Sequence, residues 1–364
     1  MADAALIRFL GGSRPAAAAD WDALIPQARA AGLLGRLAFN LERQGGLDVV
    51  PPQMRRHLVG AQLVAQRQAE AVHWEVSQIK EALDSVGVTT LLLKGAAYVM
   101  ADLPPAKGRL MSDIDILVPR DALGPVESAL MIAGWATTHH DPYDQQYYRR
   151  WMHELPPMRH VVRGSVVDVH HALLPVTARI RVDTEAMRAA AVPVQRHPQL
   201  RVLPPADMVL HAATHLFCES EWYSGLRDLS DLDLLLRHFS GCAGFWDELV
   251  ARADTVGLRR PLYYALTLSA AILGTPVPSA TLSSTSEFGP AEPLRTLMGA
   301  LFRRVLAGQL PNEQDPVAAL ARSALFLRGH WLRMPTHLLV FHLGHKVMAG
   351  ANRRAKSAAD QSTN

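Results

Sequence analysis

Two aspartates at spacing i, i+2, Asp113 and Asp115, lie in an apolar segment that continues to residue 118. Side chains alternate across a strand, so both carboxylates point to one face, and Ile114 and Ile116 point to the other, buried face. The rise of a strand separates the carboxylates by about 6–7 Å, close enough to share divalent cations. Without a cation or a cationic partner they would repel each other. The pair is a candidate metal site, although many such triplets are only solvated loop ends.

A third carboxylate, Asp168, lies in another apolar segment, residues 166–170. This segment and residues 159–163 flank Gly164-Ser165, which predicts a hairpin with a two-residue turn of type II′. Alternation puts Asp168 and His170 on one face, so Asp168 is expected beside the strand that carries Asp113 and Asp115. Three carboxylates on one sheet face would suit two Mg²⁺ ions, with Mn²⁺ as an alternative. His170 and His171 are interpreted as structural or supporting residues, with metal binding as the alternative.

The apolar run Leu91–Leu93 ends at Lys94-Gly95, and a helix is expected from about residue 96 to residue 101. Backbone N–H groups at a helix start attract phosphate oxygens, and Lys94 adds a positive charge. The alternative is a solvated lysine at a strand end. Downstream, Arg109 is expected either to clamp a triphosphate or to pair with Asp113. Ser112 is expected to bind a phosphate or the local backbone.

In combination, these residues resemble the DNA polymerase beta type of nucleotidyltransferase, and in particular the bacterial group described as uncharacterised nucleotidyltransferases. The resemblance rests on Leu93-Lys94-Gly95, on Arg109 and Ser112 ahead of the two aspartates, and on the strand that carries Asp168. It extends over roughly residues 89–240. A Lys-Gly pair stands here where the wider superfamily has Gly-Ser, and His171 stands where the group carries Trp.

The resemblance implies an α+β fold, with a small mixed sheet and helices flanked by N-terminal and C-terminal helical regions. It implies transfer of a nucleoside monophosphate from a nucleoside triphosphate to a hydroxyl acceptor, with release of pyrophosphate. Asp113, Asp115 and Asp168 would be the catalytic, metal-binding residues, and Lys94, Gly95, Arg109 and Ser112 would bind the nucleotide. The acceptor stays open between tRNA or another RNA, a protein and a small molecule. A tRNA-modifying toxin and a nucleotide-binding module without turnover are the alternatives.

The chain is expected to divide into an N-terminal helical region (residues 1–88), an α/β core (89–205), a C-terminal helical domain (206–350) and a disordered tail (351–364). A long helix is predicted from about residue 53 to residue 86, with Gly60 as a weak point. Residues 173–205, punctuated by prolines, are interpreted as a connector. Residues 141–157, rich in Tyr, Arg and Trp, are interpreted as a surface loop, with stacking on a nucleobase or RNA as the alternative.

The helical region after residue 205 carries further polar candidates. His211 and His215 lie at i, i+4, but the sequence lacks the glutamate of the H-E-x-x-H zinc motif, so packing or acceptor contacts are expected. Arg227 and Asp231 are predicted to pair at i, i+4. Asp228 is interpreted as a solvated residue at a helix start, where the helix dipole favours negative charge, with a position facing the active cleft as the alternative.

The composition fits a globular protein, with 49% apolar and 20% charged residues and a formal charge of +3. That charge is too small to be a nucleic-acid signature by itself. Two cysteines exclude a disulfide-rich scaffold and a thiol metal cluster, and fit a reduced, cytoplasmic setting. The first residues do not resemble a signal peptide, and no run of about 20 apolar residues predicts a membrane span. The sequence also lacks a Walker-A motif, which argues against a P-loop enzyme.

Overall fold

The computed structural model describes residues 2–13, 20–138, 141–307 and 315–336. Its α-helices are α1 (Ala2–Leu10), α2 (Trp21–Ala30), α3 (Leu34–Arg43), α4 (Pro52–Asp84), α5 (Lys94–Met100), α6 (Leu123–Ile132), α7 (Pro142–Trp151), α8 (Thr184–Ala189), α9 (Pro205–Cys218), α10 (Gly225–Phe239), α11 (Phe245–Thr255), α12 (Arg259–Leu273), α13 (Ser279–Ser284), α14 (Leu294–Ala307) and α15 (Pro316–Arg333). The strands are β1 (Leu91–Leu92), β2 (Ile114–Leu117), β3 (Trp135–Thr137), β4 (Met158–His160), β5 (Val166–His170), β6 (Val192–Val194) and β7 (His197–Val202). Short 3₁₀ turns are η1 (Leu47–Val49), η2 (Pro104–Ala106), η3 (Arg120–Ala122) and η4 (Ser286–Phe288).

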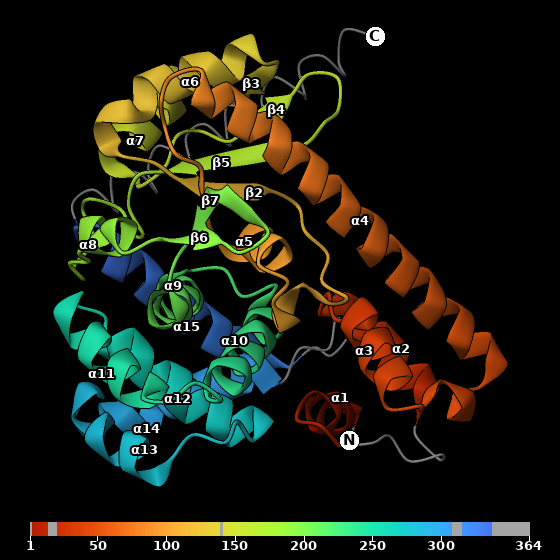
Figure 1. The fold of residues 1–364 in the computed structure, drawn as a ribbon. Helices are drawn as coiled ribbons and strands as arrows, with labels where there is room; N and C mark the ends of the chain where they lie inside the picture. Colours follow the sequence, from red (N-terminus) through yellow and green to blue (C-terminus); the bar gives the residue numbers. More distant parts are fainter. Residues whose placement is uncertain (1, 14–19, 139–140, 308–314, 337–364) are drawn as a thin grey trace, which may run out of the picture.

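The strands form one mixed sheet in the order β3-β4-β5-β2-β1-β7-β6. β2 lies at its centre, parallel to β5 and antiparallel to β1. Ile114 and Ile116 are 4% and 0% exposed, which confirms the buried apolar face predicted for this strand. The expected α+β fold, a mixed sheet with flanking helices, is therefore observed (Figure 1).

Two predictions about the sheet were wrong. The hairpin strand β4 ends at His160, and residues 161–165 form the connection to β5, so the turn is longer than the two-residue turn predicted. Residues 173–205 are not a mere connector, because β7 pairs in parallel with β1 and β6 pairs with β7. Pro193 and Pro198 did not prevent this pairing, since both lie in the terminal hairpin at the edge of the sheet, where a missing N–H costs least.

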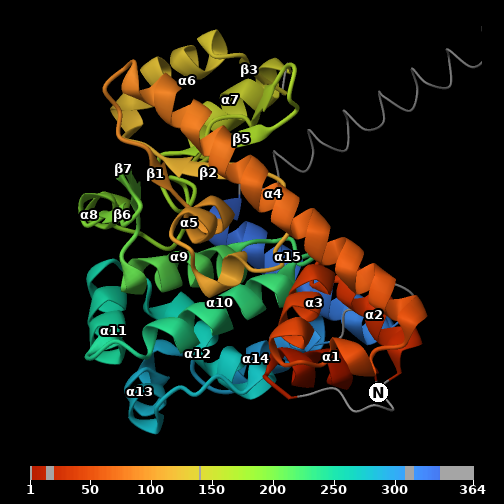
Figure 2. The same cartoon turned by 45° about the vertical axis from the view of Figure 1, so that its right-hand side comes forward.

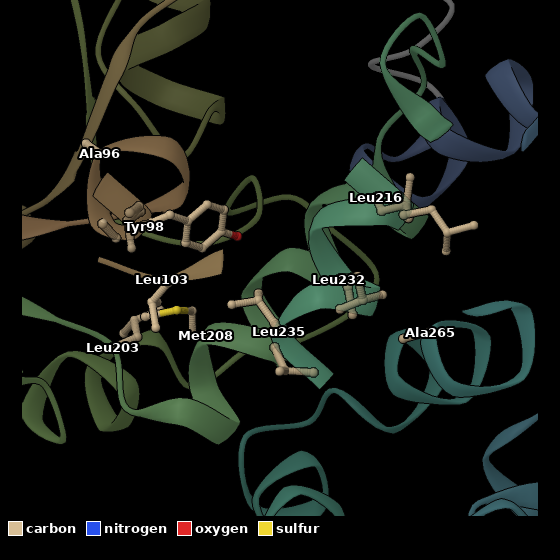
Figure 3. Packing of buried hydrophobic residues seen from close by; sticks show 14 of the residues in the cluster. Ala96, Tyr98, Leu103, Leu203, Met208, Leu216, Leu232, Leu235 and Ala265 are labelled. Atoms are coloured by element: carbon tan, nitrogen blue, oxygen red, sulfur yellow. The ribbon is translucent and has the colours of Figure 1, made fainter. Parts of the chain in front are cut away.

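Helix α5 lies between the sheet and the helices α9 and α10 (Figure 2). Its Tyr98 is 3% exposed and points from α5 toward the layer that contains Leu103, Met208 and Leu235 (Figure 3). These residues belong to one continuous hydrophobic cluster that extends from the N-terminal helices to α15. Packing of α5 against the C-terminal helices α9 and α10 therefore holds the turn that carries Lys94 and Gly95 in place.

The predicted long helix is α4, which extends from the sheet to α2 and α3 (Figure 1). The loop after η2 meets α3 at a close backbone contact between Gly108 and Gly35. A Cβ atom at Gly108, whose φ is +70°, would lie 2.4 Å from the carbonyl carbon and oxygen of Gly35. This contact ties the loop that precedes the aspartates to the N-terminal helices.

Replacing Gly60 by alanine should stabilise the protein by about 1 kcal/mol, since glycine is the poorer residue in a helix interior. Gly60 is exposed within α4, and an added Cβ would meet no atom within 4 Å. Urea unfolding would measure the gain. Gly108→Ala is the contrasting control, because its Cβ would clash with Gly35 and lower the midpoint. No gain in Gly60→Ala would contradict the helical assignment at this residue.

Several expectations for the other helical segments also changed. The Tyr/Arg/Trp segment is not a loop: residues 142–151 form α7, and Arg149 pairs with Glu127 of α6. The predicted tail lies outside the described residues. Within the described ranges, no helix is both long enough and apolar enough to cross a lipid bilayer.

Candidate active site

The sheet brings two of the three predicted carboxylates together on neighbouring strands. Asp115 on β2 and Asp168 on β5 are register partners in the parallel pair, and Asp113 immediately precedes β2. Asp115 is 2% exposed. The arrangement follows from alternation, because Ile114 and Val167 fill the opposite, apolar face of the same two strands.

Asp115 is the most heavily engaged of the carboxylates. Its Oδ1 accepts hydrogen bonds from Lys94 Nζ at 2.8 Å and from His170 Nε2 at 2.9 Å. Burial alone would raise the pKa of Asp115, but the charge of Lys94 and the hydrogen bond from His170 hold it well below its usual range. The pKa of Lys94 is raised in turn, because the attraction to Asp115 outweighs the burial of the ammonium group. Asp115 is therefore ionised at neutral pH.

The pKa values of Asp168 and Asp113 are shifted in the opposite direction, upward. Burial, and then the negative charges of Asp115, Glu154 and Asp113, raise the pKa of Asp168 to about 7. Burial and Asp115 also raise the pKa of Asp113. Asp168 Oδ1 is buried and has no hydrogen-bond partner among the described residues. A buried carboxylate oxygen without a partner, beside two more carboxylates, is a donor set that fits a hard divalent cation.

The turn between β1 and α5 carries local strain at Lys94. Its φ of 44° lies in the left-handed region, which a side chain other than that of glycine occupies at a cost of about 1–3 kcal/mol. The ion pair with Asp115 holds the side chain in this conformation. The next residue must be glycine, because a Cβ at Gly95 would lie 2.5 Å from Arg109 Nη1.

Arg109 does not pair with Asp113, the partner that the sequence offered as one alternative. Its Nε donates to Asp231 Oδ2 of α10 at 2.8 Å, and Arg36 Nη2 donates to the other oxygen of Asp231 at 2.6 Å. All three side chains are at most 9% exposed. This buried network joins α3, the loop before β2 and α10. Ser112 lies beside Asp113 and lowers the pKa of that carboxyl, where the sequence suggested contact with a phosphate or the backbone.

Two predictions for α10 were wrong. Arg227 pairs with its neighbour Asp228 at 2.9 Å, whereas Asp231 is taken by the two arginines from outside the helix. Asp228 is not a solvated helix-start residue, because its side chain is 16% exposed and lies 4.0 Å from His215. Burial raises the pKa of Asp228. Non-local partners replaced the local i, i+4 pair.

The two histidines of α9 face the same charged centre. Burial, and then the positive charges of Lys94 and His170, lower the pKa of His211 to about 3. Burial and Lys94 also lower the pKa of His215 well below its usual range. Both imidazoles are therefore neutral in the folded protein at neutral pH, which suits packing or hydrogen bonding to a bound group.

The pKa of His211 predicts a loss of stability in acid. The folded state keeps this histidine neutral while the unfolded chain protonates it below about pH 6.5, so stability falls as the pH decreases. The wild type should lose about 2 kcal/mol more than His211→Gln between pH 7 and pH 5. Urea unfolding at both values measures this difference, with the exposed His238→Gln as control. Equal pH dependence in all three proteins would contradict a buried, neutral His211.

Sequence reasoning missed Glu154 and His153, which lie beside the centre. Glu154 forms an isolated β-bridge with His170, and its Oε2 lies 3.3 Å from His170 Nδ1. His153 is 6% exposed and its Nε2 lies 3.9 Å from the same oxygen. The hydrophobic pattern around residues 153 and 154 showed neither helix nor strand periodicity. These residues follow α7 and contact β5 only through the tertiary structure. His170, interpreted as a supporting residue, connects them to Asp115.

Comparison with known proteins identifies the family. A family model described as "Uncharacterised nucleotidyltransferase" matches residues 17–274, which is more than half of the chain. The match includes α2 to α12, and so contains the sheet, the three aspartates and the buried arginine network. No curated protein and no solved structure matches the chain. On the extent of the family match, the chain belongs to the family of uncharacterised nucleotidyltransferases.

Proposed function

We propose that the protein transfers a nucleoside monophosphate from a nucleoside triphosphate to a hydroxyl acceptor with the help of Mg²⁺, and releases pyrophosphate. The observation that carries the proposal is the juxtaposition of Asp115 and Asp168 on adjacent parallel strands, with Asp113 at the start of β2. Asp168 has a raised pKa and a buried oxygen without a hydrogen-bond partner among the described residues, so a bound cation would stabilise its charged form.

Asp113, Asp115 and Asp168 would hold the metal, because hard cations prefer carboxylate oxygens. Divalent cations bound there would carry the triphosphate and offset the charge on the attacking and leaving oxygens. Lys94 lies beside the carboxylates at the start of α5 and would neutralise charge on the phosphates. Gly95, at the start of α5, would bind a phosphate oxygen through its backbone N–H. Arg109 is committed to Asp231 through Nε, so it would act on phosphate through its other nitrogens.

Thermal melting with ATP, CTP, GTP and UTP, each with and without Mg²⁺, tests the proposal. The preferred nucleotide at 100 times its Kd should add about 2.7 kcal/mol, which raises the midpoint by several degrees. The shift should require Mg²⁺ and disappear in Asp113→Asn/Asp115→Asn. The nucleotide that shifts the midpoint would then serve, with a labelled α-phosphate, to mark the acceptor among RNA, protein and small molecules. No shift with any nucleotide would count against the proposal.

One observation favours a second function, a nucleotide-binding module without turnover. Lys94 and His170 already neutralise Asp115, so a metal must compete with two cationic or hydrogen-bonding partners for this carboxylate. Such a module would show a nucleotide-dependent shift that survives the aspartate substitutions. It would release no pyrophosphate.

A further inference from the structure

Three ligand-bearing side chains converge next to Asp115, on the side of His170 away from that carboxylate. His153, Glu154 and His170 each offer one ligand atom, and these atoms all lie within 4.8 Å of one another. Glu154 Oε2 lies 3.3 Å from His170 Nδ1 and 3.9 Å from His153 Nε2. Ligands on a tetrahedral zinc ion are separated by about 3.3–3.5 Å, given bond lengths of about 2.0–2.2 Å. The spacing is already close to that of a metal site.

The backbone holds the cluster in place. Residues 153–155 run antiparallel along the end of β5: His171 N–H donates to His153 O at 2.8 Å, and Leu155 N–H donates to Val169 O at 2.9 Å. Glu154 and His170 are paired across this ladder. His153 and His170 are 6% and 4% exposed, and their rings lie 5.3 Å apart. The three side chains are therefore fixed by main-chain hydrogen bonds and burial.

The hydrogen bonds of His170 indicate which of its atoms is available. Asp115 is an ionised acceptor, so His170 Nε2 carries the proton of their 2.9 Å hydrogen bond. His170 Nδ1 then directs a lone pair at a carboxylate oxygen 3.3 Å away, unless a cation or a second proton lies between them. A metal ion bound by both atoms would satisfy this pair.

From this geometry we propose that His153, Glu154 and His170 bind one transition-metal ion of the zinc type, separate from the carboxylate site. Two imidazoles and one carboxylate are the ligands that Zn²⁺ prefers, whereas Mg²⁺ prefers oxygen alone. Asp115 orients the metal-binding His170 through its second ring nitrogen, as a carboxylate commonly does behind a zinc ligand. Asp115 thus connects this ion to the three aspartates. The inference does not depend on the proposed transferase activity.

Cobalt provides the test, because four- or five-coordinate Co²⁺ absorbs visible light strongly, in contrast to hydrated Co²⁺. Chelator-treated full-length protein would be titrated with Co²⁺, and the bound Co²⁺ would be displaced by Zn²⁺ to obtain the zinc affinity. The background would be Cys242→Ser, since Cys242 is an exposed thiol. One equivalent of Co²⁺ should develop the band. His153→Gln and Glu154→Gln, tested separately, should each weaken binding on the order of 100-fold.

Two control variants separate this site from its surroundings. His171→Gln changes the neighbouring imidazole, which lies outside the cluster, and should keep the band. Asp168→Asn removes a ligand of the proposed Mg²⁺ site and should also keep it. Circular dichroism confirms that each variant folds. Absence of the band in the wild type, or its retention in both His153→Gln and Glu154→Gln, would overturn the proposal and indicate a protonated His170 paired with Glu154.

Discussion

Replacing Asp168 by asparagine is expected to abolish nucleotidyl transfer and, at the same time, to make the metal-free protein more stable. In the wild type, burial and neighbouring carboxylates raise the pKa of Asp168 to about 7, so its ionisation opposes folding. This penalty appears as the pH rises above the ordinary value near 3.9 and is complete above pH 7. Removing the charge should gain up to about 4 kcal/mol at pH 8, and less at pH 5. Urea unfolding in the presence of a chelator measures the gain.

The loss of activity in Asp168→Asn has a different origin. Without this carboxylate, the proposed metal site loses the negative charge of a buried oxygen that has no hydrogen-bond partner among the described residues. We expect kcat to fall on the order of 10³-fold, as when a group that stabilises charge in the transition state is removed. Mg²⁺ should raise the melting temperature of the wild type and leave that of Asp168→Asn unchanged. Pyrophosphate release with the preferred nucleotide is the assay.

Asp115→Asn is the matched comparison. This substitution should also inactivate the protein, but it should lower the stability of the fold. The Lys94 ammonium and the His170 ring would stay buried without their carboxylate partner. Opposite changes in stability with the same loss of activity would separate a carboxylate that serves only the site from one that also stabilises the fold. If Asp168→Asn were as unstable as Asp115→Asn, or kept its activity, the role assigned to Asp168 would be wrong.

The second large effect is expected at Asp231, which binds both Arg36 and Arg109 in the interior. Asp231→Asn leaves two guanidinium groups buried without a countercharge, which should cost about 3–5 kcal/mol of unfolding free energy. The loss should be visible as a lower urea midpoint. Because the network joins α3, the loop before β2 and α10, the variant should also weaken nucleotide binding through displacement of Arg109.

An exposed ion pair supplies the control for Asp231. Glu70 lies 2.9 Å from Arg67 on α4, and both side chains are more than half exposed. Glu70→Gln should change stability by no more than about 0.5 kcal/mol. A loss below about 1 kcal/mol in Asp231→Asn would mean that the arginines find other partners, for example Ser230 and the carbonyl of Pro105, which Arg36 already contacts.

Residue order alone determined the local parts of this site. A period of two put Asp115 on one face of β2 and the buried isoleucines on the other, because side chains alternate across a pleated strand. The apolar segment of β5 likewise placed Asp168 and His170 on one face. The helical period and the prolines at residues 51 and 52 predicted α4 to within two residues at each end. These features depend on neighbours within a few positions.

Tertiary structure decided which groups meet. The register of Asp115 with Asp168 depends on the pairing of two strands more than 40 residues apart, and Arg109 meets Asp231 across 122 positions. Charges then took non-local partners, so the expected pairs of Arg109 with Asp113 and of Arg227 with Asp231 did not form. Glu154 and His153 reached the centre only through a β-bridge. The sequence determines which face a side chain points to, but long-range packing and burial determine what it finds there and how its pKa changes.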